Sequence, residues 1–371
     1  MQGNEACAYA AVVAGCRFFA GYPITPSSEI FEVMARELPR VGGVCIQMED
    51  EIASIMAAIG ASWAGLKSMT ATSGPGIALM AEAVGYAAMT ETPLVIVDVQ
   101  RAGPATGVPT KPSQGDIMEI RWLSNGDYEI VAMYPWSVQE VVDLTIRAFN
   151  LAEEFRVPTI LLMDGTLAHL HEKVAIPSED DVRLVNRPKP SSPPEEYMPY
   201  KPSSYLVPPM ASFGDGYRTR CEGLAHDYQG MPTSSPDVYE ELVRRLCDKI
   251  RLNSHRIAQL KYYFLDDAEV AILAYGTMAR IMYAAIRELR DEGERIGLIR
   301  PITIWPLPEE LSDLMSEMKK VLVVEMNYGQ LVREIERLTD RKRVVFCPWL
   351  RLEFPCLEEA KAMIRRHLHA G

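Results

Sequence analysis

The stretch GYPITPSSEI, residues 21–30, decides the fold, because it ends an apolar run with a rigid turn rich in hydroxyl groups. Pro23 and Pro26 each hold their own φ near about −65° and favour extended backbone at the preceding residue, so the turn cannot continue as helix. Thr25 is therefore expected to be fixed in space. Such a turn between a strand and a helix can build a ligand site, and an ordinary connection without a ligand is the alternative.

A helix is expected from Glu29 to Leu38, directly after this turn. Ser27 or Ser28 can cap it, because a side-chain oxygen at the N-cap accepts a hydrogen bond from the first free amides. These amides and the positive end of the helix dipole favour a bound anion at the turn.

Helix and strand patterns alternate along residues 1 to about 172, which predicts a mainly parallel sheet covered by helices on both faces. Beyond the helix that begins near Asn4, the expected strands and helices of this part are residues 17–22, 28–38, 44–49, 50–64, 68–73, 77–89, 94–100, 129–133, 137–155 and 159–163, with a loop at 101–116.

Residues 177–236 lose this periodicity and are rich in proline, serine and charge, which indicates an extended connector rather than an independent core. After a helix near 236–261, the alternation returns in strands 270–274, 296–300 and 321–324 and helices 277–291, 308–318 and 329–338. We therefore predict an α/β protein with three parts, residues 1–176, 177–265 and 266–371, of which the first and last are folded domains.

The net charge, the length of the apolar runs and the spacing of the cysteines argue against several classes of protein. The net charge of −12 argues against nucleic acid and anionic membranes as partners. No apolar stretch reaches the roughly 18 residues that span a bilayer, and the first residues lack the basic start of a signal peptide, so we expect a cytoplasmic protein. The seven cysteines are widely spread without a Cys-x-x-Cys pair, so we expect no disulfide framework, metal ligand or iron–sulfur cluster in this chain.

Three consecutive carboxylates, Glu49, Asp50 and Glu51, stand where an expected strand meets a helix. They repel one another unless a ligand uses one of them. One interpretation is that they are favourable partners for the helix dipole. The other is that one carboxyl is partly buried and hydrogen-bonds a ligand nitrogen.

The segment TATSGPG, residues 70–76, places glycines and hydroxyls at the carboxyl end of another strand, where open parallel sheets bind ligands. It is not a dinucleotide fingerprint, because Leu79 stands at the third glycine position, and it lacks the lysine of a phosphate-binding loop.

The segment QRAGPATG, residues 100–107, places Arg101 at a third strand end. The guanidinium fork can bind a carboxylate with two hydrogen bonds, which lysine cannot do. A solvated surface arginine is the alternative. Gln114–Asp116 extends the same loop.

Residues 214–216, Gly-Asp-Gly, could be taken for the diphosphate–magnesium motif of thiamine-diphosphate enzymes. That motif requires an asparagine pair shortly afterwards, and no asparagine occurs between Asn186 and Asn253. We therefore expect no diphosphate site here.

Together, residues 21–29, 47–51, 70–76 and 100–107 closely resemble the alpha subunit of 2-oxoacid:ferredoxin oxidoreductases, and the 2-oxoglutarate branch is the nearest match. AYGT at 274–277 and VEMNYGQ at 324–330 extend the resemblance into the last part of the chain. The resemblance implies a pyrimidine-type thiamine-diphosphate-binding domain followed by a transketolase-C-terminal-like domain.

The resemblance also implies a hetero-oligomer that oxidatively decarboxylates a 2-oxoacid to its acyl-CoA and reduces ferredoxin, or runs in reverse. Thiamine diphosphate, Mg²⁺ and coenzyme A take part. A separate beta subunit holds the diphosphate, its Mg²⁺ and a [4Fe-4S] cluster, and some members add gamma and delta subunits.

The residue roles that the resemblance implies fall into two groups. Glu51 matches the glutamate that bonds N1′ of the cofactor's aminopyrimidine, while Thr25 and Arg101 match residues that contact the substrate carboxylate. Further residues expected at the cofactor are Tyr22, Pro23, Ile24, Thr72 and Ser73, and Thr106 is expected at the substrate. The branch usually shows Arg-Gly-Gly-Pro-Ser-Thr-Gly, whereas this chain has Ala102 and Ala105, which puts the substrate in question more than the reaction type.

Two other functions remain open on the sequence. One is a non-oxidative thiamine-diphosphate enzyme, such as a transketolase-like or decarboxylase-like half. The other is a non-catalytic structural subunit, against which the presence of Thr25, Glu51 and Arg101 together speaks.

Overall fold

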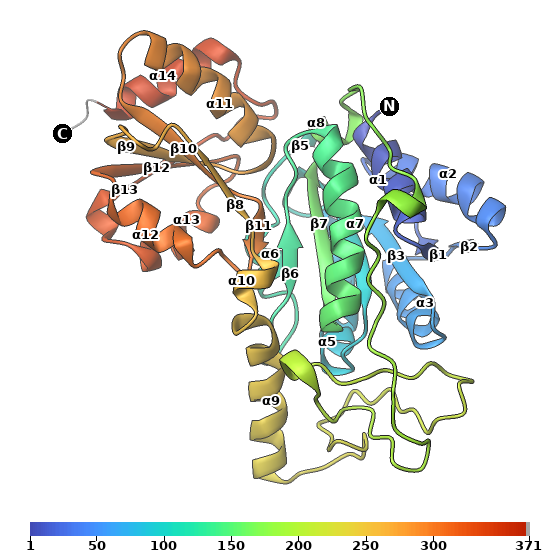
Figure 1. Cartoon of the computed structure of the whole chain (residues 1–371). Helices are drawn as coiled ribbons and strands as arrows, with labels where there is room; N and C mark the ends of the chain where they lie inside the picture. Colours follow the sequence, from blue (N-terminus) through green and yellow to red (C-terminus); the bar gives the residue numbers. More distant parts are fainter. Residues whose placement is uncertain (369–371) are drawn as a thin grey trace.

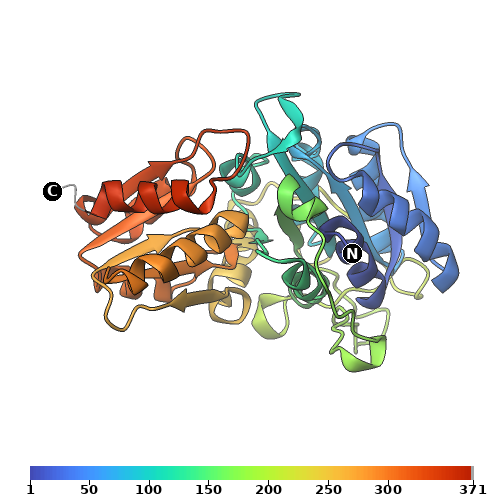
Figure 2. The same cartoon turned by 90° about the horizontal axis from the view of Figure 1, so that it is seen from above.

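The structure is a computed structural model that describes residues 1–368. It contains two α/β units that stand side by side and are joined by a long connector (Figures 1 and 2). The elements of the first unit are α1 Gly3–Val13, β1 Cys16–Gly21, α2 Ser28–Glu37, β2 Val44–Gln47, α3 Glu51–Trp63, β3 Lys67–Thr72, α4 Gly74–Leu79, α5 Ala81–Met89, β4 Leu94–Ala102, β5 Val108–Pro112, α6 Ile117–Arg121, β6 Val131–Met133, α7 Val138–Phe155, β7 Pro158–Asp164 and α8 Gly165–His169. The remaining elements are α9 Pro236–Arg251, α10 Ser254–Ile257, β8 Leu260–Tyr263, β9 Val270–Leu273, α11 Gly276–Asp291, β10 Ile296–Pro301, β11 Thr303–Trp305, α12 Glu310–Ser316, β12 Lys320–Glu325, α13 Leu331–Leu338, β13 Val344–Pro348 and α14 Leu357–Leu368.

The first unit is built on an eight-stranded sheet with the order β11-β6-β7-β4-β3-β1-β2, to which β5 adds by pairing with β4. Along this order from β6 to β2, each strand is parallel to the next, whereas β11 and β5 pair antiparallel to β6 and β4. In β4, Val95 and Val97 face the core under α1 and α7, while Leu94 and Ile96 face the core on the opposite side. Because both faces are buried, the strand is continuously apolar, as parallel strands are.

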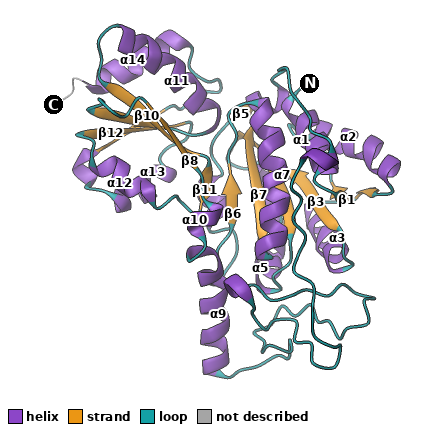
Figure 3. Ribbon diagram, in the orientation of Figure 1, coloured by secondary structure: helices purple, strands orange, loops and turns teal. Residues whose placement is uncertain are grey.

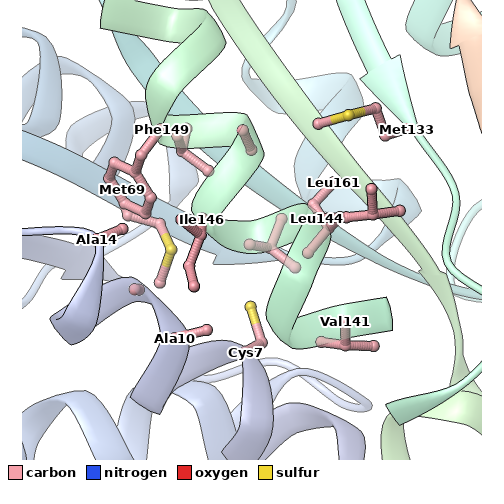
Figure 4. Packing of buried hydrophobic residues seen from close by; sticks show 14 of the residues in the cluster. Cys7, Ala10, Ala14, Met69, Met133, Val141, Leu144, Ile146, Phe149 and Leu161 are labelled. Atoms are coloured by element: carbon pink, nitrogen blue, oxygen red, sulfur yellow. The ribbon is translucent and has the colours of Figure 1, made fainter. Parts of the chain in front are cut away.

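Helices α1 and α7 pack together over one face of this sheet. Figure 4 shows Cys7 and Ala10 of α1 close to Leu144 and Ile146 of α7, with Met69 of β3 beside them. The small side chains of α1 allow the two helices to approach closely. The predicted α/β fold class is confirmed.

The second unit has a five-stranded sheet with the order β13-β12-β9-β10-β8, in which only β8 is antiparallel to its neighbour. β11 follows β10 in the chain but pairs with β6 at the edge of the first sheet. The two units are therefore tied by a shared strand as well as by the connector. The domain boundaries after residues 176 and 265 remain predictions.

The connector lies along the first unit and is almost entirely loop (Figure 3). The buried guanidinium of Arg156 holds it there by donating hydrogen bonds to the carbonyl oxygens of Pro199 and Pro208. Helix α9 is held by the buried carboxylate of Glu91, which lies 2.8 Å from both Arg245 and Lys249. Burial alone would raise the pKa of Glu91, but these cations lower it to about 2.

Several local predictions are wrong. The helix expected near 236–261 ends at Arg251, and α10 and the strand β8 follow it. Residues 101–116 are not a simple loop, because β4 and β5 form an antiparallel hairpin. Gly107 closes it with a φ of 55°, and a Cβ atom there would lie 1.6 Å from the carbonyl oxygen of Ala102, so only glycine fits. Neither Ser27 nor Ser28 caps α2: Ser28 is already its first residue, and Ser27, at the N-cap, donates its hydroxyl to the carbonyl of Ile24 at 2.9 Å.

Candidate active site

Three predicted motifs meet at one edge of the first sheet. β1, β3 and β4 are adjacent parallel strands, so their carboxyl ends lie together. Gly21, Thr72 and Arg101 stand at or next to these ends. The three motifs therefore lie close together, as the sequence predicted. They lie at the edge at which open α/β sheets bind ligands.

The turn after β1 is held in place from α1. Asn4 donates from Nδ2 to the carbonyl of Pro26 and to Oε2 of Glu29, both at 2.8 Å. Asn4 is fully buried. Because these bonds fix the turn on both sides of the helix start, Thr25 has a defined position, as expected. Sequence reasoning missed Asn4, because an asparagine in a first helical turn carries no local sign of a partner 22 residues away.

Arg101 is 7% exposed, so the interpretation as a solvated surface arginine is wrong. Its Nη1 donates to the carbonyl of Thr25 at 2.9 Å, and its buried Nε has no hydrogen-bond partner among the described residues. The side chain lines a cavity of about 610 Å³ whose walls come from α4, the β4–β5 hairpin, the loop before α6 and, in the second unit, the segments after β12 and β13. A donor remains available there for an anionic ligand.

The three acidic residues before and in α3 have separate environments. Asp50 is the N-cap and accepts a hydrogen bond from the amide of Ala53 at 2.7 Å, which is the structural role proposed for the triplet. Glu49 is exposed. Glu51 is 4% exposed, and its nearest hydrogen-bond donor among the described residues is Thr72 Oγ1, at 3.4 Å. Only Glu51 is thus a buried carboxylate with acceptor capacity to spare.

The first turn of α4 lies between Glu51 and the cavity. A Cβ atom on Gly76 would lie 2.0 Å from Thr72 Oγ1 and 2.7 Å from Glu51 Oε1, so a larger residue would displace that pair. Gly74 and Pro75, in the same turn, line the cavity with Arg101. Gly76 therefore serves close packing around Glu51, and Gly74 allows the same turn to approach Asp116.

The other predicted ligand residues have mixed placements. Ser73 is buried and its Oγ has no hydrogen-bond partner among residues 1–368. Tyr22 and Pro23 are exposed at the same sheet edge, and Ile24 is half-buried. Thr106 is exposed on the hairpin and is not among the residues that line the cavity with Arg101.

Comparisons with known proteins identify the family of this chain. Residues 9–245 match the family described as "Pyruvate flavodoxin/ferredoxin oxidoreductase, thiamine diP-bdg", and residues 268–349 match "Pyruvate:ferredoxin oxidoreductase core domain II". The chain belongs to the 2-oxoacid:ferredoxin oxidoreductase family. It is an alpha subunit, and its high-identity relatives lie in the 2-oxoglutarate branch.

Two such relatives are the 2-oxoglutarate synthase subunits KorA of Methanothermobacter marburgensis and Methanocaldococcus jannaschii. The first is 54% identical over 342 residues, which are 92% of this chain and 91% of that protein. The second is 52% identical over 345 residues, which are 93% of each.

Two solved structures are also similar. A 2-oxoglutarate:ferredoxin oxidoreductase from Magnetococcus marinus, solved with 2-oxoglutarate, coenzyme A and succinyl-CoA bound, has a TM-score of 0.94 and 34% identity; the match covers 99% of this chain and 64% of that one. A split-gene transketolase with a TM-score of 0.53 and 12% identity, covering 99% of this chain and 96% of that one, shows the shared fold alone.

In this alpha subunit, the second-unit motif VEMNYGQ closes the cavity by binding the loop before α6. Gln114 donates from Nε2 to the carbonyl of Tyr275 at 2.9 Å and accepts the amide of Met326 at 3.1 Å. Asn327 Nδ2 donates to the carbonyl of Gln114 at 2.8 Å, and Gln330 bonds the carbonyl of Gly115. The motif that carried the resemblance in the second unit therefore holds a wall of the cavity.

The Gly-Asp-Gly segment at 214–216 is a local turn in the connector of this subunit. Asp215 Oδ2 accepts hydrogen bonds from Ser212 N at 2.9 Å and Lys189 Nζ at 3.0 Å. Within residues 1–368, no group of three or more His, Cys, Asp or Glu side chains is arranged to hold a metal ion. Over the same residues, no helix combines the length and apolar character that crossing a membrane requires.

Proposed function

We propose that this subunit supplies the pyrimidine side and the substrate-carboxylate side of an enzyme that oxidatively decarboxylates 2-oxoglutarate to its acyl-CoA and reduces ferredoxin, or runs the reverse reaction. The observation that carries the proposal is the pairing of two buried groups around one turn of α4. Arg101 lies at the cavity on one side of this turn, and Glu51 lies against Gly76 on the other.

Glu51 fits the aminopyrimidine of thiamine diphosphate. Its carboxylate is buried and, over residues 1–368, has only the long contact with Thr72, so it can accept a hydrogen bond from a protonated ring nitrogen. A carboxylate that holds a proton at that nitrogen promotes the tautomer that activates the cofactor. The cofactor itself supplies the nucleophilic carbon and the electron sink of the decarboxylation.

Arg101 and Thr25 fit the carboxylate of a 2-oxoacid. The Nη1 group of Arg101 is already committed to the Thr25 carbonyl, which fixes the plane of the guanidinium. Its remaining nitrogens can bind an anion without reorganisation, and the low exposure of the site strengthens that interaction. Thr25 is exposed on the same turn, so its hydroxyl is available to donate to the same ligand.

The proposal includes a beta subunit that carries the diphosphate site, Mg²⁺ and a [4Fe-4S] cluster, with ferredoxin as the electron acceptor and, in some assemblies, gamma and delta subunits. Exposed apolar side chains around the start of α3 support a protein partner at this edge: Tyr22, Val44, Ile46, Ile52, Met56 and Leu79. Three cysteines of this chain are core residues, since burial raises the pKa of Cys7, Cys16 and Cys347 to about 12. Their environments do not favour thiolate ligands to a cluster. A cytoplasmic location stays a prediction.

The experiment that tests the proposal is Arg101→Lys in the assembled complex. Lysine keeps the charge but loses the fork, so we expect the KM for 2-oxoglutarate to rise about tenfold or more, while the apparent affinities for thiamine diphosphate and coenzyme A stay nearly unchanged. The control is Arg333→Lys at an exposed position of α13. An Arg101→Lys complex with unaltered 2-oxoacid kinetics would remove Arg101 from the site.

A further inference from the structure

A second, smaller cavity lies between the connector and α9. Its volume is about 90 Å³, and it shares no lining residue with the cavity at Arg101. The connector contributes Tyr200 and His226 to its wall, and α9 contributes Leu242 and Arg245. Because a water molecule takes up about 30 Å³ in the liquid, the cavity has room for an ion of about four or five heavy atoms.

His226 brings an unused hydrogen-bond acceptor to this cavity. The residue is 1% exposed, and its ring centroid lies 4.0 Å from that of Tyr200. Its Nδ1 lies 2.8 Å from the carbonyl oxygen of Leu224, which can only accept, so Nδ1 carries the hydrogen. Burial lowers the pKa of His226, so the ring is neutral at about pH 7.5 and Nε2 presents a lone pair. Nε2 is buried and has no hydrogen-bond partner within residues 1–368.

Arg245 brings unused donors to the same cavity. Its side chain is buried, and its Nη1 donates to the carboxylate of Glu91 at 2.9 Å. Its Nε is also buried and has no hydrogen-bond partner in the part of the chain that the structure describes. Because Glu91 takes Nη1, the edge formed by Nε and Nη2 is left for a ligand. This edge of a guanidinium binds an oxyanion with two parallel hydrogen bonds.

The buried charges behind Arg245 leave an excess of positive charge. Lys249 Nζ also donates to the carboxylate of Glu91, at 2.8 Å. Arg156 Nε donates to the main-chain carbonyl oxygen of Glu91 at 2.9 Å. All four side chains are buried, so three cations share one carboxylate in this cluster. Because a buried charge without a partner is costly, an anion in the cavity would stabilise the free edge of Arg245.

Two carboxylates also line the cavity, but hydrogen bonds within the chain already engage them. Glu241 accepts a hydrogen bond from the hydroxyl of Tyr228. Asp227 Oδ1 accepts the amides of Gln229 and Met231, both at 2.9 Å. Glu241 is exposed, where solvent and salt screen its charge. The buried part of the wall is therefore its positive part.

We propose that this cavity binds a small oxyanion that carries a proton, such as hydrogen phosphate or bicarbonate, between the connector and α9. Oxygens of the ion accept hydrogen bonds from the Nε–Nη2 edge of Arg245, and its hydroxyl donates to Nε2 of His226. One ion thus supplies both missing partners and ties the connector to the helix. The proposal does not depend on the proposed function, because neither Glu51 nor Arg101 takes part.

The test compares hydrogen phosphate with sulfate, which has the same shape and charge but no proton at about pH 7.5. Calorimetry on the assembled complex should give a Kd for hydrogen phosphate about tenfold or more below that for sulfate, because a bare oxygen of sulfate would face the lone pair of His226. Bicarbonate and nitrate form a second, planar pair with the same difference of one proton. Comparing the two pairs identifies which of the two ions the cavity holds.

Two variants assign the binding to these side chains. In His226→Phe, which keeps a ring beside Tyr200 but has no acceptor, the Kd values of each pair should become nearly equal. In Arg245→Lys, which keeps a cation for Glu91 but loses the fork, both ions of a pair should bind about tenfold more weakly. Arg244→Lys, at the exposed neighbouring position, is the control and should bind as the wild type does.

Hydrogen exchange locates the ion in the complex. The preferred ion should slow exchange of the amides in residues 224–231 and 238–245, and its proton-free counterpart should not. This measurement and the wild-type Kd values decide the question even if His226→Phe does not fold. The inference is overturned if neither hydrogen phosphate nor bicarbonate binds more tightly than its counterpart, if His226→Phe retains the preference, or if the protected amides lie elsewhere. Arg101→Lys should leave all of these results unchanged.

Discussion

Glu51 and Glu325 are both buried glutamates at the junction of a strand and a helix, yet their surroundings are opposite. Glu325 accepts hydrogen bonds from Tyr275 OH at 2.8 Å and from Asn327 Nδ2 and the amides of Leu331 and Val332 at 2.9 Å. Within the described part of the chain, the Glu51 carboxylate accepts one hydrogen bond, from Thr72 at 3.4 Å. A buried carboxylate with every oxygen satisfied holds a structure together, whereas one with spare acceptors is available to a ligand.

The variant Glu51→Gln is the strongest test of this difference between the two glutamates. An amide cannot share a proton with the cofactor ring, so turnover of the assembled complex should fall about 10²-fold or more. The free energy of unfolding should change little, because Glu51 has no strong hydrogen bond to lose. The matched control is Glu49→Gln, at the exposed neighbour. If Glu49→Gln abolishes turnover and Glu51→Gln is close to wild type, the assignment within the acidic triplet is wrong.

Glu325→Gln tests the other half of the comparison. The side-chain NH2 group of the glutamine would point at groups that are themselves hydrogen-bond donors. Because an unsatisfied buried polar group costs about 1–3 kcal/mol, the free energy of unfolding should fall by about 2 kcal/mol. Urea unfolding measures this loss. Glu334→Gln on the same helix removes only a surface ion pair with Arg337 and should cost about 0.5 kcal/mol or less. A Glu325→Gln protein as stable as the Glu334→Gln protein would show that the network around Glu325 contributes nothing to stability.

The two glutamates also show how much of the site could be predicted from the sequence. The acidic triplet was noticed because the start of a helix after a strand is a local feature, and Glu51 was chosen within it only through the family resemblance. Glu325 belonged to the motif that carried the resemblance, but its role could not be predicted. Its partners include Tyr275, 50 residues away, and the loop that its motif holds is more than 200 residues away. The contact with Tyr275 depends on how the strands of the second unit pair, and the contact with the loop depends on how the two units dock; no local pattern encodes either.

The same limit explains Asn4. It is a buried polar residue in the first turn of α1, and its partners, Pro26 and Glu29, come from elsewhere in the chain. The hairpin after β4 is a different case, because Gly107 was visible in the sequence. A lone glycine is compatible with many loops. The requirement for glycine at position 107 arises from the close approach to the carbonyl of Ala102, which only the structure shows.

Thr25→Val is the smallest expected effect and the finest test of the ligand side of the comparison. Valine keeps the shape of the side chain and the backbone carbonyl that accepts from Arg101, so the guanidinium should stay in place. Only the hydroxyl is lost, and one neutral hydrogen bond is worth about 1 kcal/mol, which raises the KM for the 2-oxoacid about fivefold. Thr110→Val, at an exposed position of β5, is the control. Because the change acts on the substrate alone, the apparent affinity for thiamine diphosphate should be the same in both variants. A lowered cofactor affinity in Thr25→Val would place this hydroxyl on the Glu51 side of α4 instead.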